Sequence, residues 1–466
     1  MSSDPSNSPH LTPGPIPGET VSAPPPKKRG PIRRGLKSVA IDLAPIKVSR
    51  DFRLLYLGQT VSFFGSMMTY VVMPWQMYQL TKSSLAVGLL GAVEFVPMLL
   101  LAFVGGALAD YVDRRRLILM TELATALCVG VLAFNSLLAQ PRVWIIYVIA
   151  GFFAALNGLQ RPSREALIQQ LVPTEHMTAV AALHTLRFSI GAIIGPAAGG
   201  LLASSFGPII TYSIDFATFS VSLITLWMVR STPRLSDADR PSLRSIAEGL
   251  RYARSRPELL GTYLIDINAM FFGMPMALFP AYAESFGPFW IGPFQVVSAV
   301  GIMYAAPSVG SLLATLSSGW TSRIHRHGAA ITLAAAVWGL AIIGFGLSHS
   351  LLIALAWLAL AGAGDTISGL FRMAMWNQTI PDRLRGRLAG IEMISYMTGP
   401  LLGNAEAGLV ATLFSLRTSI VSGGILCTLG SGLLGVLLPA FWRYHAREGI
   451  ARRQAEEAQQ QSATDG

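Results

Sequence analysis

Six acidic side chains lie inside long apolar stretches of this chain, where a charge is costly and therefore suggests a function. Glu94 and Asp266 lie in the apolar interior of their stretches, and a second group comprises Asp215, Asp365, Glu392 and Glu406. A carboxyl group in an apolar environment favours its neutral form, so it can exchange a proton near neutral pH. We predict reversible protonation at one or more of these residues, with a structural ion pair as an equal alternative for each.

The stretches that carry these residues are predicted to be transmembrane helices. The chain has 466 residues, of which 52% are hydrophobic and only 13% charged, whereas charged residues make up about 25% of a soluble domain. The net charge of +10 comes from short basic clusters between apolar runs and not from one basic face, so nucleic-acid binding is not expected. We therefore predict an all-α polytopic membrane protein.

Motifs of the common membrane enzymes are missing from the sequence. It contains no HExxH, P-loop or GxSxG pattern, and its seven His residues are dispersed. The expectation is a protein that is not an enzyme and has no cofactor and no metal site. Cys128 and Cys427 each lie in an apolar run, so packing is expected there and not a disulfide.

Twelve apolar runs are long enough, at about 20 residues each, to cross a bilayer. They are predicted at residues 54–77, 85–109, 117–139, 143–162, 179–203, 208–229, 260–284, 294–320, 328–348, 351–375, 388–413 and 417–441. Two six-helix bundles, 48–230 and 258–443, are separated by a linker, 231–257, whose pattern predicts an amphipathic surface helix. Residues 1–47 are expected to be a disordered basic tail without a cleaved signal peptide, and 444–466 a second tail.

The distribution of Lys and Arg predicts the orientation of these helices. Most basic loops, among them the one with Arg114, Arg115 and Arg116, lie on one side, and the other side holds only Lys82, Arg142 and Arg417. Because basic loops stay in the cytoplasm, both termini are predicted to be cytoplasmic.

The two predicted bundles repeat one another at an offset of 208 residues. Gly191 aligns with Gly399, Gly195 with Gly403, Gly200 with Gly408 and Arg164 with Arg372. Parallel repeats of this kind are typical of transporters, in which the substrate site lies between the halves near the midplane.

Helix-disfavouring residues cluster in the fifth span, at Gly191, Gly195, Pro196, Gly199 and Gly200. Gly at four-residue spacing lets another helix approach closely, and Pro is tolerated where neighbours satisfy the freed carbonyl. The pattern predicts a packing strip and, at Pro196, a hinge or gate.

The loop after the second span resembles the signature of the major facilitator superfamily. Gly106, Asp110, Arg114 and Arg115 fit that signature, whereas Tyr111 and Asp113 depart from it. The resemblance implies a fold of twelve helices and a conformational latch in which Asp110 faces the start of helix eleven, near residues 385–388. The alternative is that Asp110 and the arginines only set the topology.

Within that superfamily the fifth span resembles the signature of antiporters and exporters, although an earlier Gly of the signature falls at Ala182. Residues 163–183 and 242–257 look like the branch of transmembrane secretion effectors that contains enterobactin, macrolide and multidrug exporters. The resemblance covers about residues 48–443 and implies proton-driven export of siderophores or lipophilic drugs.

Other residues are expected to form the gate and the cavity. Arg164 and Arg372 are predicted to close an inner gate, and Glu122 to pair with Arg187 or with the loop arginines. Aromatic side chains that could line a cavity, or alternatively face lipid and neighbouring helices, are Phe63, Phe64, Trp75, Phe271, Phe272 and Trp376.

The sequence thus predicts a secondary transporter of the bacterial inner membrane. Its expected partners are the lipid bilayer, a siderophore or drug-like cargo and protons as the coupling ion, and a monomer is expected. A proton-coupled importer and a non-transporting sensor or scaffold are the alternatives.

Overall fold

The computed structural model describes residues 42–111, 113–230, 251–291, 294–296, 298–381 and 384–464. Most of the expected N-terminal tail and most of the linker therefore lie outside the described residues, as do the side chains of residues 102–111. Ala44–Val48 form a short helix, α2, at the end of the range predicted to be a tail. Residues 251–255 of the linker are helical.

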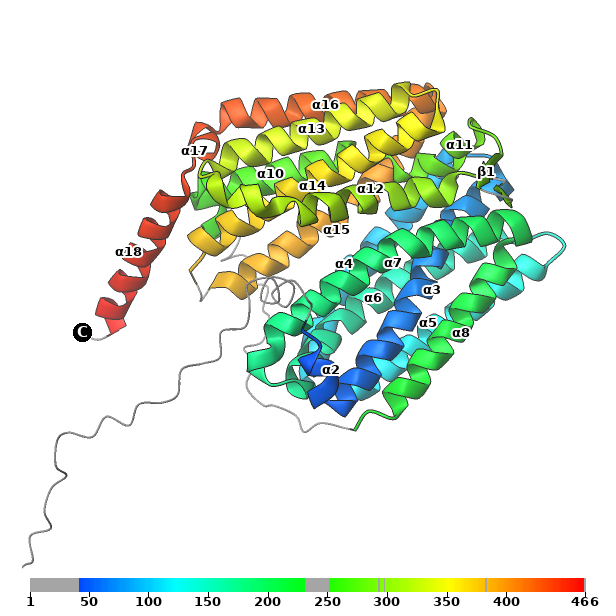
Figure 1. The fold of residues 1–466 in the computed structure, drawn as a ribbon, viewed down its shortest axis with the longest axis horizontal. Helices are drawn as coiled ribbons and strands as arrows, with labels where there is room; N and C mark the ends of the chain where they lie inside the picture. The colour runs from blue at the N-terminus through cyan, green and yellow to red at the C-terminus, as the bar shows by residue number, and fades with distance from the viewer. Residues whose placement is uncertain are drawn as a thin grey trace, which may run out of the picture. The chain divides into compact units, whose positions relative to one another are not determined.

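Six long helices form the N-terminal bundle, each at the place of a predicted span. They are α3 (Arg50–Thr81), α4 (Ser84–Tyr111), α5 (Arg114–Leu137), α6 (Val143–Leu171), α7 (Met177–Phe206) and α8 (Pro208–Trp227), with a 3-10 turn, η1 (Thr174–His176), before α7. Within the bundle α3 packs on α7 and α8, and α4 packs on α6. Figure 1 shows this bundle beside the second one.

The C-terminal bundle has its main helices at the places of the other six predicted spans, and the first of these is broken. Its main helices are α10 (Pro257–Phe272), α12 (Val300–Leu316), α13 (His327–Leu347), α14 (Leu351–Thr379), α15 (Arg385–Leu413) and α16 (Leu416–Leu437). After α10 the chain continues through a 3-10 turn, η2 (Met276–Leu278), and α11 (Phe279–Glu284). The indole N–H of Trp338 donates to the carbonyl of Gly273 over 3.0 Å, which satisfies a backbone group at the break.

Short elements connect and follow these helices. An antiparallel pair of strands, β1 (Phe289–Ile291) and β2 (Phe294–Val296), precedes α12, and a 3-10 helix, η3 (Ser318–Arg323), follows it. At the C-terminus α17 (Pro439–Trp442) leads into α18 (Ala446–Thr464), which packs against α14. Residues predicted to be a C-terminal tail therefore form a docked helix.

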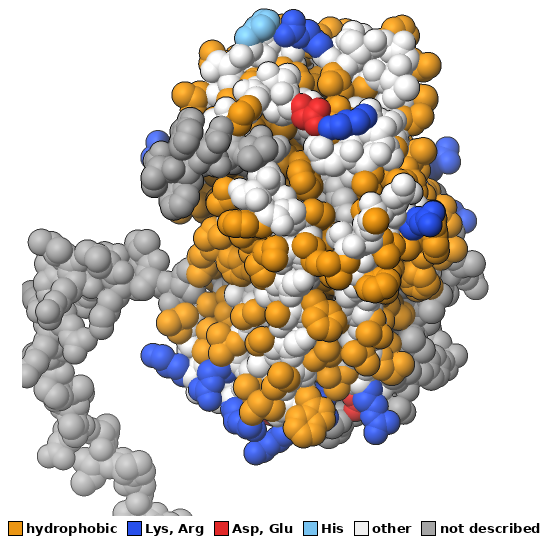
Figure 2. Space-filling view, turned by 90° about the vertical axis from the view of Figure 1, so that its right-hand side faces the viewer, with side chains coloured by type: hydrophobic (Ala, Val, Ile, Leu, Met, Phe, Trp, Pro, Cys, Tyr) orange, Lys and Arg blue, Asp and Glu red, His pale blue; other side chains and the backbone are white. Residues whose placement is uncertain are grey.

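The surface of the bundles is apolar, as a bilayer requires. Among the described residues, nine helices are long and apolar enough to cross a membrane by length and composition. The shorter α12, together with α3 and α15, packs within the same bundles. Figure 2 shows hydrophobic side chains over the middle of the face in view, with Lys and Arg towards its upper and lower ends.

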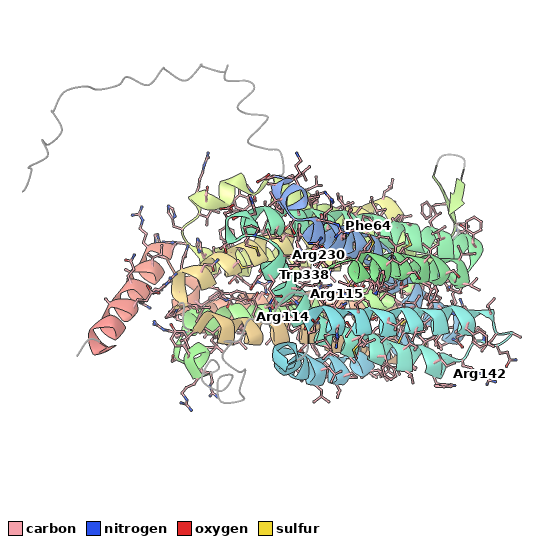
Figure 3. The ribbon with its side chains drawn as sticks, turned by 90° about the horizontal axis from the view of Figure 1, so that it is seen from below. Phe64, Arg114, Arg115, Arg142, Arg230 and Trp338 are labelled. Carbon is pink, nitrogen blue, oxygen red and sulfur yellow. The ribbon has the colours of Figure 1, made fainter. Side chains whose placement is uncertain are left out.

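Arginines at one end of the N-terminal bundle hold helix termini together. Arg115 donates from Nε to the carbonyl of Leu226 near the end of α8 over 3.2 Å, and Asp113 caps α5 by accepting from the backbone N–H of Arg116 over 2.9 Å. We call this the basic end, where Arg114, Arg115 and Arg230 lie. Arg142 lies at the other end of α5 and α6, the opposite end (Figure 3).

The two bundles meet mainly through α4 with α15 and α7 with α12. A Cβ at Gly88 would overlap the backbone of Asn404, and one at Gly200 would overlap Gly301, so these helices touch near the opposite end. An ion pair of 2.6 Å between Lys82 Nζ and Glu284 Oε1 joins the bundles at that end. The bundles are therefore closed against each other at the opposite end.

Candidate functional site

One arginine and two carboxylates form a charge cluster inside the C-terminal bundle. Asp266 on α10 is ion-paired with Arg372 on α14, and these residues are only 3% and 9% exposed. Arg372 Nη2 also lies 3.8 Å from Asp365 Oδ1, because residues seven apart share one face of α14. Glu392 on α15 interacts electrostatically with the same arginine. One carboxylate can therefore accept a proton while another keeps the arginine paired.

Glu94 on α4 lies at the seam between the bundles. It is close enough to Tyr70 on α3 and Tyr304 on α12 to interact electrostatically with both. The two tyrosine rings, one from each bundle, meet edge to face with centroids 5.7 Å apart, and Tyr304 donates to the carbonyl of Met276 over 2.8 Å. The sequence pointed to Glu94 but not to Tyr70 and Tyr304. The only sign of these two residues in the sequence is a hydroxyl group within an otherwise apolar stretch.

Asp215 and Glu122 have hydroxyl partners within the N-terminal bundle. Asp215 on α8 is 1% exposed and accepts hydrogen bonds from Thr69 and Thr218. Glu122 on α5 accepts from Ser222 over 2.8 Å. These bonds tie α8 to α3 and to α5. Buried carboxylates with such bonds fit the structural alternative.

Glu406, the sixth predicted carboxylate, is partly buried on α15, near the opposite end. It lies away from the Arg372 cluster, in the segment of α15 next to Gly408, which packs on the start of α4.

The predicted latch can be followed only in part. Gly106 and Asp110 belong to α4, but the surroundings of Gly106 and the side chain of Asp110 are not described, and neither are the side chains of Arg385 and Arg387. Arg114 donates to the carbonyl of Ala166 on α6 over 3.4 Å. The described part of the motif thus ties together the ends of α5, α6 and α8.

The two arginines predicted to close a gate lie near carboxylates of their own bundles. Arg164 on α6 interacts electrostatically with Glu122, and Arg372 on α14 pairs with Asp266. A neighbouring residue, Arg161, contacts the other bundle by donating to the hydroxyl of Tyr396 on α15.

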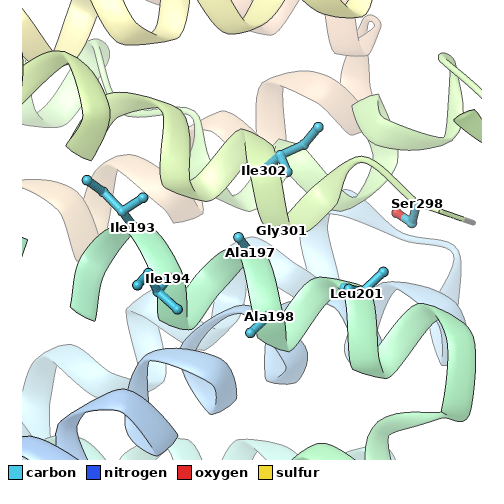
Figure 4. Close-up of a pocket in the computed structure, with 8 residues that line it drawn as sticks. All are labelled: Ile193, Ile194, Ala197, Ala198, Leu201, Ser298, Gly301 and Ile302. Atoms are coloured by element: carbon cyan, nitrogen blue, oxygen red, sulfur yellow. The ribbon is translucent and has the colours of Figure 1, made fainter. Parts of the chain in front are cut away.

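The glycines of α7 face two different neighbours. Cβ atoms at Gly191, Gly195 and Gly199 would meet Phe63, Met67 and Met68 of α3, so these three glycines pack within the bundle. Gly200 instead touches Gly301 of α12, and the carbonyl of Pro196 also faces Gly301 (Figure 4). The motif therefore serves both the interior of one bundle and the seam between the two.

The aromatic residues predicted to line a cavity pack against different neighbours. Phe63 packs against Phe188 with centroids 5.8 Å apart, and Phe271 meets Phe272 edge to face at 4.8 Å. The backbone carbonyl of Phe64 faces Gly195. Trp75 packs against both of the main apolar cores.

Trp376 is 8% exposed, stacks on Tyr263 and donates from Nε1 to Thr262 over 2.9 Å. It is thus held between α14 and α10.

A cavity of about 290 Å³ lies where α7 and α12 meet. Its lining is apolar apart from one serine, and it consists of Ile193, Ile194, Ala197, Ala198, Leu201, Ser298, Gly301 and Ile302 (Figure 4). Ile194 is 52% and Leu201 40% exposed, so this hollow lies on the outer side of the seam, away from the charged residues.

Comparison with known proteins identifies relatives of the whole membrane domain. The sequence model of a family described as transmembrane secretion effectors matches residues 40–459. The enterobactin exporter EntS of Shigella flexneri is 29% identical over 410 residues, covering 86% of this chain and 95% of the exporter. EntS of Escherichia coli O1:K1 / APEC is 28% identical over 407 residues, with the same two coverages.

Solved structures of transporters share the fold. A POT family transporter in complex with 5-aminolevulinic acid has a TM-score of 0.67 at 11% identity and covers 84% of this chain and 97% of its own. A bacterial homologue of the human lysosomal transporter Spinster, inward-facing and unoccupied, has a TM-score of 0.64 at 16% identity, with coverages of 88% and 99%. The predicted all-helical transporter fold is confirmed.

Proposed function

We propose that this chain, which belongs to the transmembrane secretion effector family of major facilitator transporters, exports an amphipathic small molecule in exchange for protons. Family and fold make it a secondary transporter and not an enzyme. Its relatives at 28–29% identity are enterobactin exporters, which supports a siderophore or a drug-like molecule as the cargo. Beyond the family assignment, we propose that protons drive the transport and that the cargo moves out of the cell.

The membrane orientation follows from the basic end. Arg114 and Arg115 hold helix termini there, whereas Arg142 and Lys82 lie at the opposite end. We place the basic end and both termini in the cytoplasm of a bacterium, with the bundles in the inner membrane. Since the bundles are closed at the opposite end, the space between them is then shut off from the outer side of the membrane in this structure.

The cluster around Arg372 is the observation that carries proton coupling. Asp266 and Asp365 approach one guanidinium from two helices, and Glu392 adds a third acidic group. Glu392 also interacts with Arg161, so two arginines face three carboxylates, and a proton on one of the carboxylates relieves repulsion at little cost. Release of that proton changes the attraction between α10, α14 and α15, the helices that carry these residues.

Glu94 supplies a second protonation site at the seam. It lies beside Tyr70 and Tyr304, which belong to different bundles. Its charge therefore bears on the contact between the bundles, whereas the Arg372 cluster lies within one of them. Export is favoured over import by the α7 motif and by the enterobactin exporters among the relatives.

Inverted membrane vesicles test this proposal. With the interior acidified, we expect uptake of enterobactin or of the lipophilic cation ethidium, and we expect a protonophore to abolish it. Asp266→Asn, Asp365→Asn and Glu94→Gln should each uncouple uptake from the gradient. Glu175→Gln is the matched control, because its side chain is 77% exposed in the short turn η1.

The outcomes separate the alternatives. If the uptake of every cargo tested does not depend on the proton gradient, proton-coupled export is refuted. Cargo that moves in the same direction as the protons would identify an importer. Wild-type coupling in all three amide variants would remove these carboxylates as proton carriers.

A further inference from the structure

A second arginine, Arg187, is buried in the N-terminal bundle without a carboxylate partner among the described residues. It lies on α7, about 15 Å along the helix from its first residue by the rise of 1.5 Å per residue, and is 9% exposed. Its neighbours in the electrostatic sense are another cation, Arg164, and the hydroxyl of Tyr56. A cation at this depth is costly unless something neutralises it.

Arg187 and its hydrogen-bond partners have more donors than acceptors. Its Nη1 donates to Gln59 Oε1 over 3.3 Å, and its Nη2 lies 3.2 Å from His184 Nδ1. Because a guanidinium only donates, the Gln59 oxygen and the His184 Nδ1 must both be acceptors. The remaining polar atoms are then all donors: Arg187 Nε and Gln59 Nε2, which are buried without an acceptor in the described part of the chain, and the N–H on His184 Nε2.

Such a set of groups is matched to one kind of ligand. Buried N–H groups without acceptors each forfeit the free energy of a hydrogen bond, so an oxygen anion placed among them would gain several charge-assisted bonds. Water would satisfy the donors but would not neutralise the cation. Gln59 is 4% exposed, so packing holds its amide in a fixed position and keeps it out of solvent.

Aromatic rings lie beside the donors. The guanidinium of Arg187 lies 5.6 Å from the ring centre of Phe63, and that ring packs against Phe188. Phe63 in turn occupies the space left by the missing side chain of Gly191. An apolar or aromatic body attached to the anion would therefore have a surface to pack on.

We propose that Arg187, Gln59 and His184 bind an anionic oxygen group, a carboxylate or phenolate, on an amphipathic cargo. The inference rests on the proposed function only in naming the ligand a cargo. It adds a chemical class, a lipophilic organic anion, and it assigns recognition to the N-terminal bundle. The acidic residues around Arg372, in the other bundle, then have proton binding as their proposed role.

Binding to two matched probes tests the site without any flux. The full chain is reconstituted in nanodiscs of zwitterionic phosphatidylcholine, and the fluorescence anisotropy of 1-pyrenebutyrate is compared with that of its neutral methyl ester, with empty nanodiscs subtracted. We expect the carboxylate to bind about tenfold tighter than the ester or more, since hydrogen bonds to a charged group are the strong ones.

Two variants alter the site in different ways. Arg187→Gln removes the cation. Gln59→Glu places a carboxylate beside Arg187, where an oxygen already lies at 3.3 Å, so it should fill the site from within and also suit the fold. Both should abolish the preference for the carboxylate. Arg142→Gln, an exposed arginine at the opposite end, is the matched control for the loss of one positive charge and should retain the preference.

Thermal unfolding of each reconstituted variant shows whether it is folded. A wild-type protein without a preference for the carboxylate would overturn the proposal. So would a wild-type preference in folded Gln59→Glu. A preference that both variants lose, in a protein that moves no cargo in vesicles, would support this site and refute export.

Discussion

Replacing Gly200 by alanine is expected to open the seam between the two bundles. Gly200 on α7 touches Gly301 on α12, and a Cβ there would lie 2.5 Å from the backbone nitrogen of Gly301. Backbone atoms cannot move aside as a flexible side chain can. The added methyl group therefore has to separate the two helices.

The size of the effect follows from this distance. Ordinary contact begins at 3.4 Å, so the helices must part by about 0.9 Å at this point. Overpacking of this kind costs about 1–3 kcal/mol. Because the contact exists only while the opposite end is closed, the cost falls on the closed state, and the equilibrium should move towards opening there by about 5- to 150-fold.

The neighbouring glycine is the matched control. A Cβ at Gly199 would lie 2.7 Å from Cα of Met68 on α3, a helix of the same bundle. Gly199→Ala should therefore strain open and closed states alike, lowering thermal stability without shifting the equilibrium. Gly432→Ala, where the Cβ would meet nothing within 4 Å, should change neither.

Distances between spin labels measure the equilibrium. Labels at Phe206 and Phe414, which are 67% and 72% exposed at the ends of α7 and α15, report on separation of the bundles at the opposite end once Cys128 and Cys427 are replaced. Gly200→Ala should enlarge the long-distance population. An unchanged distribution in Gly200→Ala, or an equal shift in Gly199→Ala, would refute the assignment of these two glycines to different interfaces.

Two further predictions concern charged groups. Lys82→Glu should open the opposite end slightly, by less than Gly200→Ala, because the pair with Glu284 is exposed and worth under about 1 kcal/mol. The double variant Lys82→Glu with Glu284→Lys should restore the distances between the spin labels. If it does not, the ion pair does not hold the seam. Asp215→Asn should lower thermal stability by about 1–2 kcal/mol, because Thr69 and Thr218 each bond to one carboxylate oxygen and the amide keeps only one oxygen. It should leave proton-coupled uptake intact, and loss of coupling in a stable variant would show that Asp215 carries protons.

The sequence predicted the helices well because the bilayer imposes one simple requirement. A span must be apolar and about 20 residues long, and hydropathy detects this without any tertiary information. The break after α10 was not foreseen, since Gly273 and Pro275 in an apolar run do not by themselves end a span. The break is accompanied by a hydrogen bond from Trp338, a distant residue, to the carbonyl of Gly273 that is freed there. The docking of α18 likewise depends on distant acceptors, such as the carbonyl of Asn377 for Arg453.

The candidate site was predictable residue by residue but not as an arrangement. Hydropathy alone located Asp266 and Glu94, because a charge inside an apolar run is conspicuous. Their partners come from other helices: Arg372 for Asp266, and tyrosines of both bundles for Glu94. Glu122 was expected to pair with Arg187 or with loop arginines. It bonds to Ser222 and interacts with Arg164, while the hydrogen bonds of Arg187 go to Gln59 and His184.

The α7 helix connects the two proposals physically. Arg187 and Gly200 lie thirteen residues apart on it, about 20 Å by the helix rise, one beside the proposed anion and the other at the seam. Pro196 lies between them inside the helix. Its ring removes one backbone hydrogen bond, so the helix bends there more readily than elsewhere. If an anionic cargo draws Arg187 towards itself, the change in α7 reaches the Gly200 contact through this point. Under this scheme Pro196→Ala should leave the preference for the carboxylate probe intact while weakening the effect of the bound probe on the label distances, which separates recognition from opening.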